Sequence, residues 1–109
     1  MNSLQILNLF LKAENERDWH TYRQFLSHDV VWELHSHTYS KIEGIENYLN
    51  TIISAYESNR TTFEIETIVK SKDSSRIVAV LRNSVGERSC DIFEFEAGLI
   101  VREYEFILG

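Results

Sequence analysis

The chain has 109 residues, of which 17 are acidic and 11 are Lys or Arg, giving a formal net charge of −6. This charge excludes a typical nucleic-acid binder, in which basic side chains gather on one face. Hydrophobic residues make up 43% of the chain, a globular value, and the single Cys90 cannot form an internal disulfide. We see no targeting segment and no apolar run long enough to span a membrane. We therefore expect one acidic domain, residues 1–109, in the cytoplasm.

The first half of the chain predicts three helices and one strand. Apolar residues recur three and four positions apart, which is typical of amphipathic helices. Ser3 and Asp18 are the expected N-caps of the first two helices, and Gly44 precedes the third. A β-branched and aromatic run predicts a strand, and residues 36–41 after it are expected to form a loop. The helices are predicted over residues 3–16, 19–26 and 45–56, and the strand over residues 30–34.

The second half of the chain predicts strands only. Beyond residue 60 the apolar period becomes two, and the predicted strands are joined by short connections that favour an antiparallel meander. Helices followed by strands are typical of an α+β domain, in which helices pack on one face of a curved, mostly antiparallel sheet. The predicted strands cover residues 63–70, 76–83, 88–96 and 99–108.

The last hairpin determines which way the C-terminal charges point. Gly98 suits a three-residue loop of residues 96–98, which pairs Asp91 with Glu103 and turns both, together with Glu105, into the interior. Burial and mutual repulsion would both raise the pKa of these carboxyl groups, as acid–base chemistry requires. A two-residue loop is the alternative, and it sends both glutamates to solvent. The residues expected to share the inward face are Asp91, Phe93, Phe95, Leu99, Val101, Glu103, Glu105 and Ile107.

Other candidate residues have an ordinary interpretation beside the functional one. Glu33, His35 and His37 alternate as metal ligands can, but the strand is expected to end near His35, so we predict no metal site. Trp32 and Tyr56 either pack in the core or line a pocket. The sequence has no glycine-rich phosphate loop and no paired cysteines, so we predict no cofactor.

The outer face of the predicted sheet carries an apolar strip of Ile92, Ile100, Tyr104 and Phe106. A strip of this kind on a small domain usually marks an interface. We therefore predict a two-fold homodimer that packs through the outer faces of the sheets.

In the order and spacing of its motifs, the chain resembles the NTF2-like superfamily, and within it the SnoaL-like proteins. This resemblance implies a cone-shaped, cystatin-like α+β barrel, whose curved sheet wraps a long helix and leaves a pocket at its open end. It also implies frequent homodimers, and activities that range from isomerases, cyclases, hydrolases and dehydratases to proteins without catalysis. The resemblance covers nearly the whole chain and rests on Phe10–Asp18, Leu26–Trp32, Glu43–Ile45 and Cys90–Glu105.

Residue by residue, the resemblance points to the C-terminal strands. Asp91 matches the protonated oxyanion-hole aspartate of ketosteroid isomerase, whereas Phe10 and Leu34 stand where that enzyme has its tyrosine and its base. Glu105 stands where SnoaL-like polyketide cyclases carry an acid–base aspartate, and Glu103 lies two residues before it. Two of the three ketosteroid isomerase groups are thus missing, which disfavours that particular reaction.

We therefore expect a small-molecule pocket that acts on a small, mostly apolar ligand with a carbonyl, enol or epoxide group. Glu105 is expected to be the general acid or base, Asp91 to hydrogen-bond a developing oxyanion, and Glu103 to tune both. The alternative is a non-catalytic module that binds a ligand or another protein. The candidate substrate contacts are Phe10, Trp32, Leu34, His35, Tyr56 and Phe93.

Overall fold

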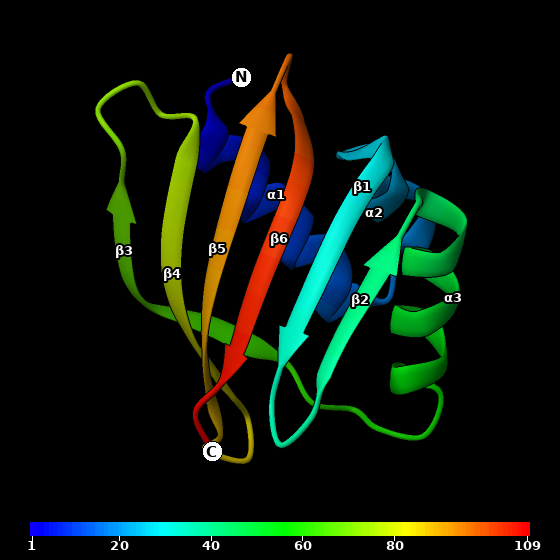
Figure 1. Cartoon of the computed structure of the whole chain (residues 1–109). Helices are drawn as coiled ribbons and strands as arrows, with labels where there is room; N and C mark the ends of the chain where they lie inside the picture. The colour runs from blue at the N-terminus through cyan, green and yellow to red at the C-terminus, as the bar shows by residue number, and fades with distance from the viewer.

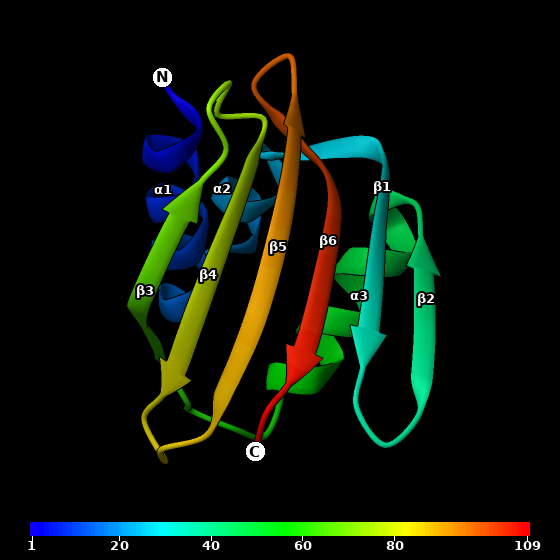
Figure 2. The ribbon, with the colours of Figure 1, turned by 60° about the vertical axis from the view of Figure 1, so that its left-hand side comes forward.

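The computed structural model describes the whole chain, residues 1–109, as three helices packed on one face of a six-stranded sheet (Figure 1). The strand order is β2-β1-β6-β5-β4-β3, and every neighbouring pair is antiparallel except β1 and β6. The sheet curves around the helices and stays open between its edges β2 and β3 (Figure 2). This confirms the expected α+β class. The elements are α1 (Ser3–Glu16), α2 (Trp19–Arg23), β1 (Leu26–His35), β2 (Tyr39–Glu43), α3 (Ile45–Tyr56), β3 (Phe63–Lys70), β4 (Arg76–Asn83), β5 (Arg88–Glu96) and β6 (Leu99–Ile107).

The helix starts follow from local capping. The N-cap of α1 is Asn2 rather than Ser3, because the Asn2 side chain accepts from the backbone N–H of Gln5 while the Gln5 side chain accepts from that of Asn2. Asp18 caps α2, as predicted, by accepting from the backbone N–H of Thr21. None of the three helices is long and apolar enough to cross a membrane.

One part of the sheet differs from the expected meander. The expected loop at 36–41 is instead a short turn followed by β2, which pairs antiparallel with β1. On its other side β1 runs parallel to β6, so that Trp32 lies opposite Glu103 and Leu34 opposite Glu105. The parallel pairing therefore brings the first strand beside the C-terminal carboxyl groups.

The β5–β6 loop has two residues rather than three. Ala97 and Gly98 form it, with φ of 51° and 78°, the signs that a type I′ hairpin turn requires. Phe95 therefore pairs with Ile100, and Ile100 is fully buried. The expectation that Leu99 faces the interior is wrong, because the shorter loop moves the pairing by one residue.

A β-bulge then restores the inward direction of the glutamates. Val101 is the extra residue, so beyond it Phe93 lies opposite Glu103 and Asp91 opposite Glu105. Glu103 is buried and Glu105 half-buried, whereas Val101, expected inside, is only half-buried. The two-residue loop is thus correct, but its expected consequence, two glutamates in solvent, is wrong.

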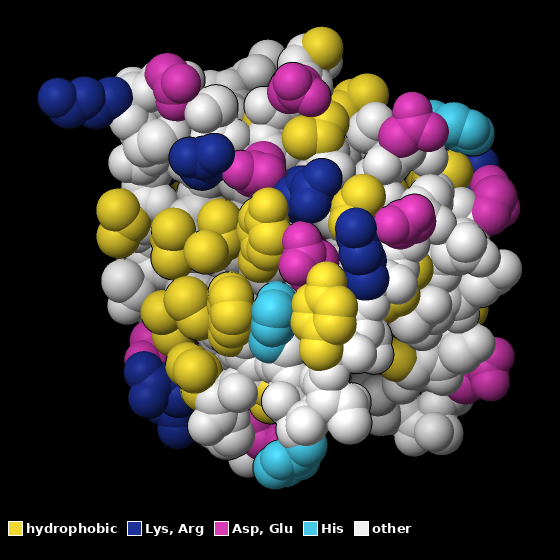
Figure 3. Space-filling model, in the orientation of Figure 1, with side chains coloured by type: hydrophobic (Ala, Val, Ile, Leu, Met, Phe, Trp, Pro, Cys, Tyr) yellow, Lys and Arg dark blue, Asp and Glu magenta, His cyan; other side chains and the backbone are white.

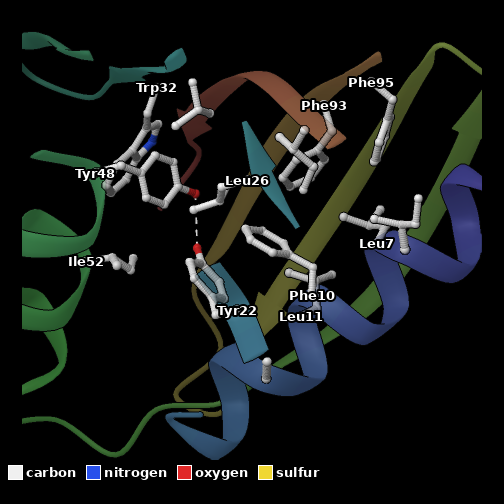
Figure 4. Close-up of a cluster of buried hydrophobic side chains, with 14 of the residues drawn as sticks. Leu7, Phe10, Leu11, Tyr22, Leu26, Trp32, Tyr48, Ile52, Phe93 and Phe95 are labelled. Carbon is white, nitrogen blue, oxygen red and sulfur yellow. Dashed lines mark hydrogen bonds between the residues drawn. The ribbon is translucent and has the colours of Figure 1, made fainter. Parts of the chain in front are cut away.

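The core fills the space between α1 and the middle of the sheet. The Phe10 ring stacks on Tyr22, with ring centroids 4.0 Å apart, and meets Phe93 edge to face (Figure 4). Leu7 lies one turn earlier on the same buried face of α1. This packing closes one end of the space between helices and sheet, and the aromatic rings continue toward the other end.

Candidate active site

A cavity of about 530 Å³ lies between the helices and the sheet, toward the ends of β1, β4 and β6. Its volume is within the range of about 300–1,000 Å³ that is usual for small-molecule sites. The walls are largely aromatic and aliphatic, and no Lys, Arg or His side chain lines them. The aromatic residues that line it are Phe10, Tyr22, Trp32, Tyr56, Phe63 and Phe93.

Five carboxyl groups line this cavity, four of them buried or half-buried and the fifth, Glu87 of the β4–β5 turn, exposed. One carboxylate oxygen from each of Asp91, Glu103 and Glu105 lies within 4.8 Å of the other two. Asp91 and Glu103 are only 4% and 5% exposed, and Glu14 of α1, on the cavity wall, is 8% exposed. Adjacent carboxyl groups in an apolar setting cannot all be ionised near neutral pH. The cluster as a whole therefore carries less than one negative charge for each carboxyl group.

Glu103 is held by a chain of two tyrosines. The Tyr48 hydroxyl donates to Glu103 Oε1 at 2.5 Å, and the Tyr22 and Tyr48 hydroxyl oxygens lie 3.0 Å apart (Figure 4). Burial raises the pKa of Glu103 well above its ordinary value, the charges of Asp91 and Glu105 raise it further, and the bond from Tyr48 opposes the shift. The tyrosines fix the position of this carboxyl group.

Asp91 differs from its neighbours because its Oδ1 atom is buried without a hydrogen-bond partner. Burial, and then the charge of Glu105, holds the pKa of Asp91 well above its usual range. A buried polar atom left unpaired costs about 1–3 kcal/mol. Because Asp91 lines the cavity, a polar atom of a ligand could remove that cost.

Glu105 titrates in the neutral range. The Trp32 indole N–H donates to Glu105 Oε1 at 3.2 Å. Burial and then the charge of Glu14 raise the pKa of Glu105 from 4.5 to about 7, while the bond from Trp32 opposes the shift. A carboxyl group with this pKa can both give and take a proton at neutral pH.

Glu14 belongs to the site although no candidate residue of the sequence indicated it. The Tyr56 hydroxyl donates to Glu14 Oε2 at 2.5 Å, and burial raises the pKa of Glu14. The Arg17 guanidinium lies 3.9 Å from the Tyr56 ring centroid and donates to the carbonyls of Asn59 and Thr61, which line the cavity. The sequence signal for Glu14 was its position on the apolar stripe of α1, one turn after Phe10.

The structure brings most of the predicted site residues together. All three predicted acidic residues line the cavity, as do five of the six predicted contacts. His35 is the exception and is corrected: its ring stacks on Phe106, with centroids 4.6 Å apart, on the outer face of the sheet. Because side chains alternate along β1, Leu34 faces inward and its neighbour cannot. The five contacts on the cavity wall are Phe10, Trp32, Leu34, Tyr56 and Phe93.

The outer face of the sheet carries an apolar patch over β3 to β6, shown in Figure 3. Ile92, Tyr104 and Phe106 lie on it, as predicted, but Ile100 does not, because the two-residue loop turns it into the core. Strand pairing adds aliphatic neighbours from β3 and β4 to the patch. Its apolar residues are Val69, Val78, Val80, Ile92, Tyr104 and Phe106.

Residues 7–103 match the SnoaL-like domain family. No protein with a curated description matches the sequence. A candidate ketosteroid isomerase from Kribbella flavida is 19% identical with a TM-score of 0.81, over 98% of this chain and 78% of that one. An LEH-like epoxide hydrolase from Mycobacterium tuberculosis is 18% identical with a TM-score of 0.82, over 96% and 81%. Another protein of that organism, solved with estradiol-17β-hemisuccinate, is 19% identical with a TM-score of 0.80, over 95% and 92%. Identities this low show a common fold.

Proposed function

The chain belongs to the SnoaL-like domain family, and from this premise we propose that it binds a small, mostly apolar molecule and moves a proton on it. The observation that carries the proposal is the cluster of Asp91, Glu103 and Glu105 on the wall of an apolar cavity. Buried carboxyl groups without a basic partner destabilise a folded protein, and such groups are concentrated at catalytic sites. Acidic side chains without a function would be expected in solvent and not on the wall of an apolar cavity.

Glu105 is the proton carrier in this proposal. Its pKa of about 7 leaves both protonation states populated at neutral pH, which is the optimum for a general acid or base. For a ligand with a C–H bond next to a carbonyl, the Glu105 carboxylate takes the proton from carbon. The electron pair of that bond forms the C=C bond of an enolate, with the negative charge on the former carbonyl oxygen. The proton then returns from Glu105 as the C=O bond re-forms, either to the same carbon or, where the ligand has a neighbouring C=C bond, to the far end of that bond.

Asp91 stabilises the oxygen that becomes negative in this step. Its raised pKa keeps it protonated, so its O–H can donate to the developing oxyanion. A preorganised donor of this kind is worth about 3 kcal/mol of transition-state stabilisation. Glu103, fixed by Tyr48, acts as a positioning residue, because it lies beside both groups and because burial and their charges raise its own pKa well above its ordinary value.

A second candidate function is ligand binding without chemistry. The apolar residues Phe10 and Leu34 line the cavity, at positions where the resemblance to ketosteroid isomerase would place a tyrosine and a base. A site with fewer functional groups than that enzyme fits a binding module as well. The two functions share the cavity and differ in whether Glu105 transfers a proton.

The experiment that separates them follows hydrogen exchange of an enolisable ketone. The chain is mixed with 2-tetralone in D₂O, and loss of the α-proton signals is followed by ¹H NMR. We expect the exchange rate of the Glu105→Gln variant to be lower than the parent rate by a factor of about 100 or more, because general acid–base groups contribute about 10²–10⁴-fold. Glu64→Gln, which removes an exposed carboxylate outside the cavity, should match the parent rate. Equal rates in the parent and Glu105→Gln would leave only the binding function.

A direct measurement of the carboxyl groups tests the basis of both candidate functions. In a ¹³C NMR titration, Glu105 should show a midpoint near 7, and Asp91 and Glu103 should titrate above their ordinary range. Midpoints at the ordinary values of free Asp and Glu would show that the cluster is solvated and would remove the proposed chemistry.

We also propose that two copies of the chain pack through the apolar patch on the outer face. Exposed apolar patches of this kind mark association surfaces. A two-fold arrangement would place the same residues on both sides of the interface and leave both cavities on the outside of the dimer.

A further inference from the structure

We infer that the natural ligand of the cavity carries a positively charged nitrogen on an apolar body, so that it is an organic ammonium ion. This inference rests on the proposed function, because it specifies the ligand of the same cavity. Three features of the site carry it: the charge of the wall, an unpaired acceptor on it, and the aromatic rings around it.

The wall has buried or half-buried acidic groups from three elements, an exposed one, Glu87, from the β4–β5 turn, and no basic group. Glu14 comes from α1, Asp91 from β5, and Glu103 and Glu105 from β6. The charge of Arg17 acts on Glu14, but its guanidinium donates to the loop carbonyls of Asn59 and Thr61 and lies over the Tyr56 ring, and Arg17 does not line the cavity. Inside an apolar cavity an anionic ligand would be repelled by this wall and a cationic one attracted.

One acceptor on this wall lacks a donor. Glu103 accepts from Tyr48 and Glu105 accepts from Trp32, whereas Asp91 Oδ1 is buried without a partner. An ammonium group brings two or three N–H donors and a charge, and a hydrogen bond with one charged partner is about twice as strong as a neutral one. Asp91 keeps its proton on the other carboxyl oxygen, so Oδ1 can accept from the ammonium group, and the negative charge that faces the cation comes from ionised Glu105.

The remaining walls suit the rest of such a ligand. The rings of Phe10, Trp32, Tyr56, Phe63 and Phe93 line the cavity. Aromatic faces attract ammonium groups, and the same rings bury an apolar body. The combination of carboxylates at one wall and rings around it is selective for an amphiphilic cation over a neutral ligand of equal size.

A divalent metal ion fits the site less well. The three carboxylate oxygens of Asp91, Glu103 and Glu105 are close enough to surround one ion. However, hard cations take six or more oxygen ligands or keep several waters, and here Trp32 and Phe93 occupy neighbouring wall positions. Two of the carboxyl groups already accept hydrogen bonds.

The test compares 4-phenylbutylamine with 4-phenylbutan-1-ol, which differ only in the charged group. Binding of each to the full chain is measured by isothermal titration calorimetry near pH 8, where the amine is protonated and Glu105 is ionised. We expect the amine to bind about tenfold more tightly or better. In Asp91→Ala, which removes the Oδ1 acceptor, and in Glu105→Gln, which removes the charge, the ratio should fall toward one while alcohol binding persists, and in Glu64→Gln it should not change.

The outcomes separate the inference from the proposed function. Equal binding of amine and alcohol would overturn the inference and leave a small-molecule cavity. Tight binding of Mn²⁺ alone, without preference for the amine, would also overturn it, in favour of a metal site. Binding of neither probe would overturn it as well, and the carboxyl titration would then decide the proposed function independently. An amine preference that survives in both carboxyl variants would show that it arises outside the cluster.

Discussion

Glu105→Gln should stabilise the folded protein at alkaline pH and leave it almost unchanged at acidic pH. The pKa of Glu105 is raised in the folded chain, from 4.5 to about 7, so the unfolded state binds fewer protons between these values. The free energy of unfolding therefore falls as pH rises through this window. Near pH 8, ionisation of Glu105 costs the folded protein about 3 kcal/mol relative to the unfolded chain, and near pH 5 most of that cost is absent.

The Gln variant removes this titration while keeping an oxygen that accepts from the Trp32 indole. Urea unfolding, followed by fluorescence of the two tryptophans, is measured near pH 5 and near pH 8. The loss of stability between these pH values should be about 2 kcal/mol smaller in Glu105→Gln than in the parent chain. The exposed Glu64→Gln should retain the parent pH dependence. If Glu105→Gln retains it too, Glu105 titrates at its ordinary pKa and the reasoning about burial fails.

Three other perturbations test separate parts of the structure. Tyr48→Phe should lower the free energy of unfolding by about 1–3 kcal/mol, because it removes the hydrogen-bond donor of the buried Glu103 carboxyl group. Tyr39→Phe removes an exposed hydroxyl and should lower the free energy of unfolding by less than about 0.5 kcal/mol. Equal losses in the two variants would contradict the buried network. Ala97→Asn should raise the urea midpoint, with a gain of about 0.5–1 kcal/mol, because Asn tolerates the left-handed conformation better than Ala, and a loss would contradict the type I′ turn. Light scattering should find the parent at twice the monomer mass, Phe106→Lys at the monomer mass, and Val85→Lys, in the β4–β5 turn, still dimeric; a monomeric parent would refute the interface.

The elements that depend on local pattern could be predicted from the sequence. The long helices and the last four strands appear where the apolar period places them, because period and side-chain burial are linked directly. The strand β2 could not be found in this way, since it is five residues long, sits at a sheet edge and is mostly exposed. Its formation depends on pairing with β1, and the parallel pairing of β1 with β6 depends on residues more than 60 positions apart. Such contacts leave no trace in local spacing.

The inward direction of the glutamates was predicted correctly from an incorrect register. The three-residue loop and the uninterrupted alternation were both wrong, and the two errors cancel because the bulge at Val101 shifts the register back. Neither feature can be read from the turn sequence alone, because Ala97 takes a conformation that its residue type disfavours. Glu14 was missed for another reason. A polar residue on a helix shows its partner only after the helix has packed.

The contacts around the carboxyl cluster make three similar groups chemically different. Glu103 accepts from a buried tyrosine, Glu105 accepts from an indole near the cavity wall, and Asp91 has one oxygen without any partner. Proton transfer needs such a difference, because one group must stay protonated while another changes its charge. A chain under no demand except folding would gain stability by replacing these groups with apolar residues of similar size. Their presence together in a cavity without a basic residue is therefore the strongest physical reason to assign the cluster to the ligand rather than to the fold.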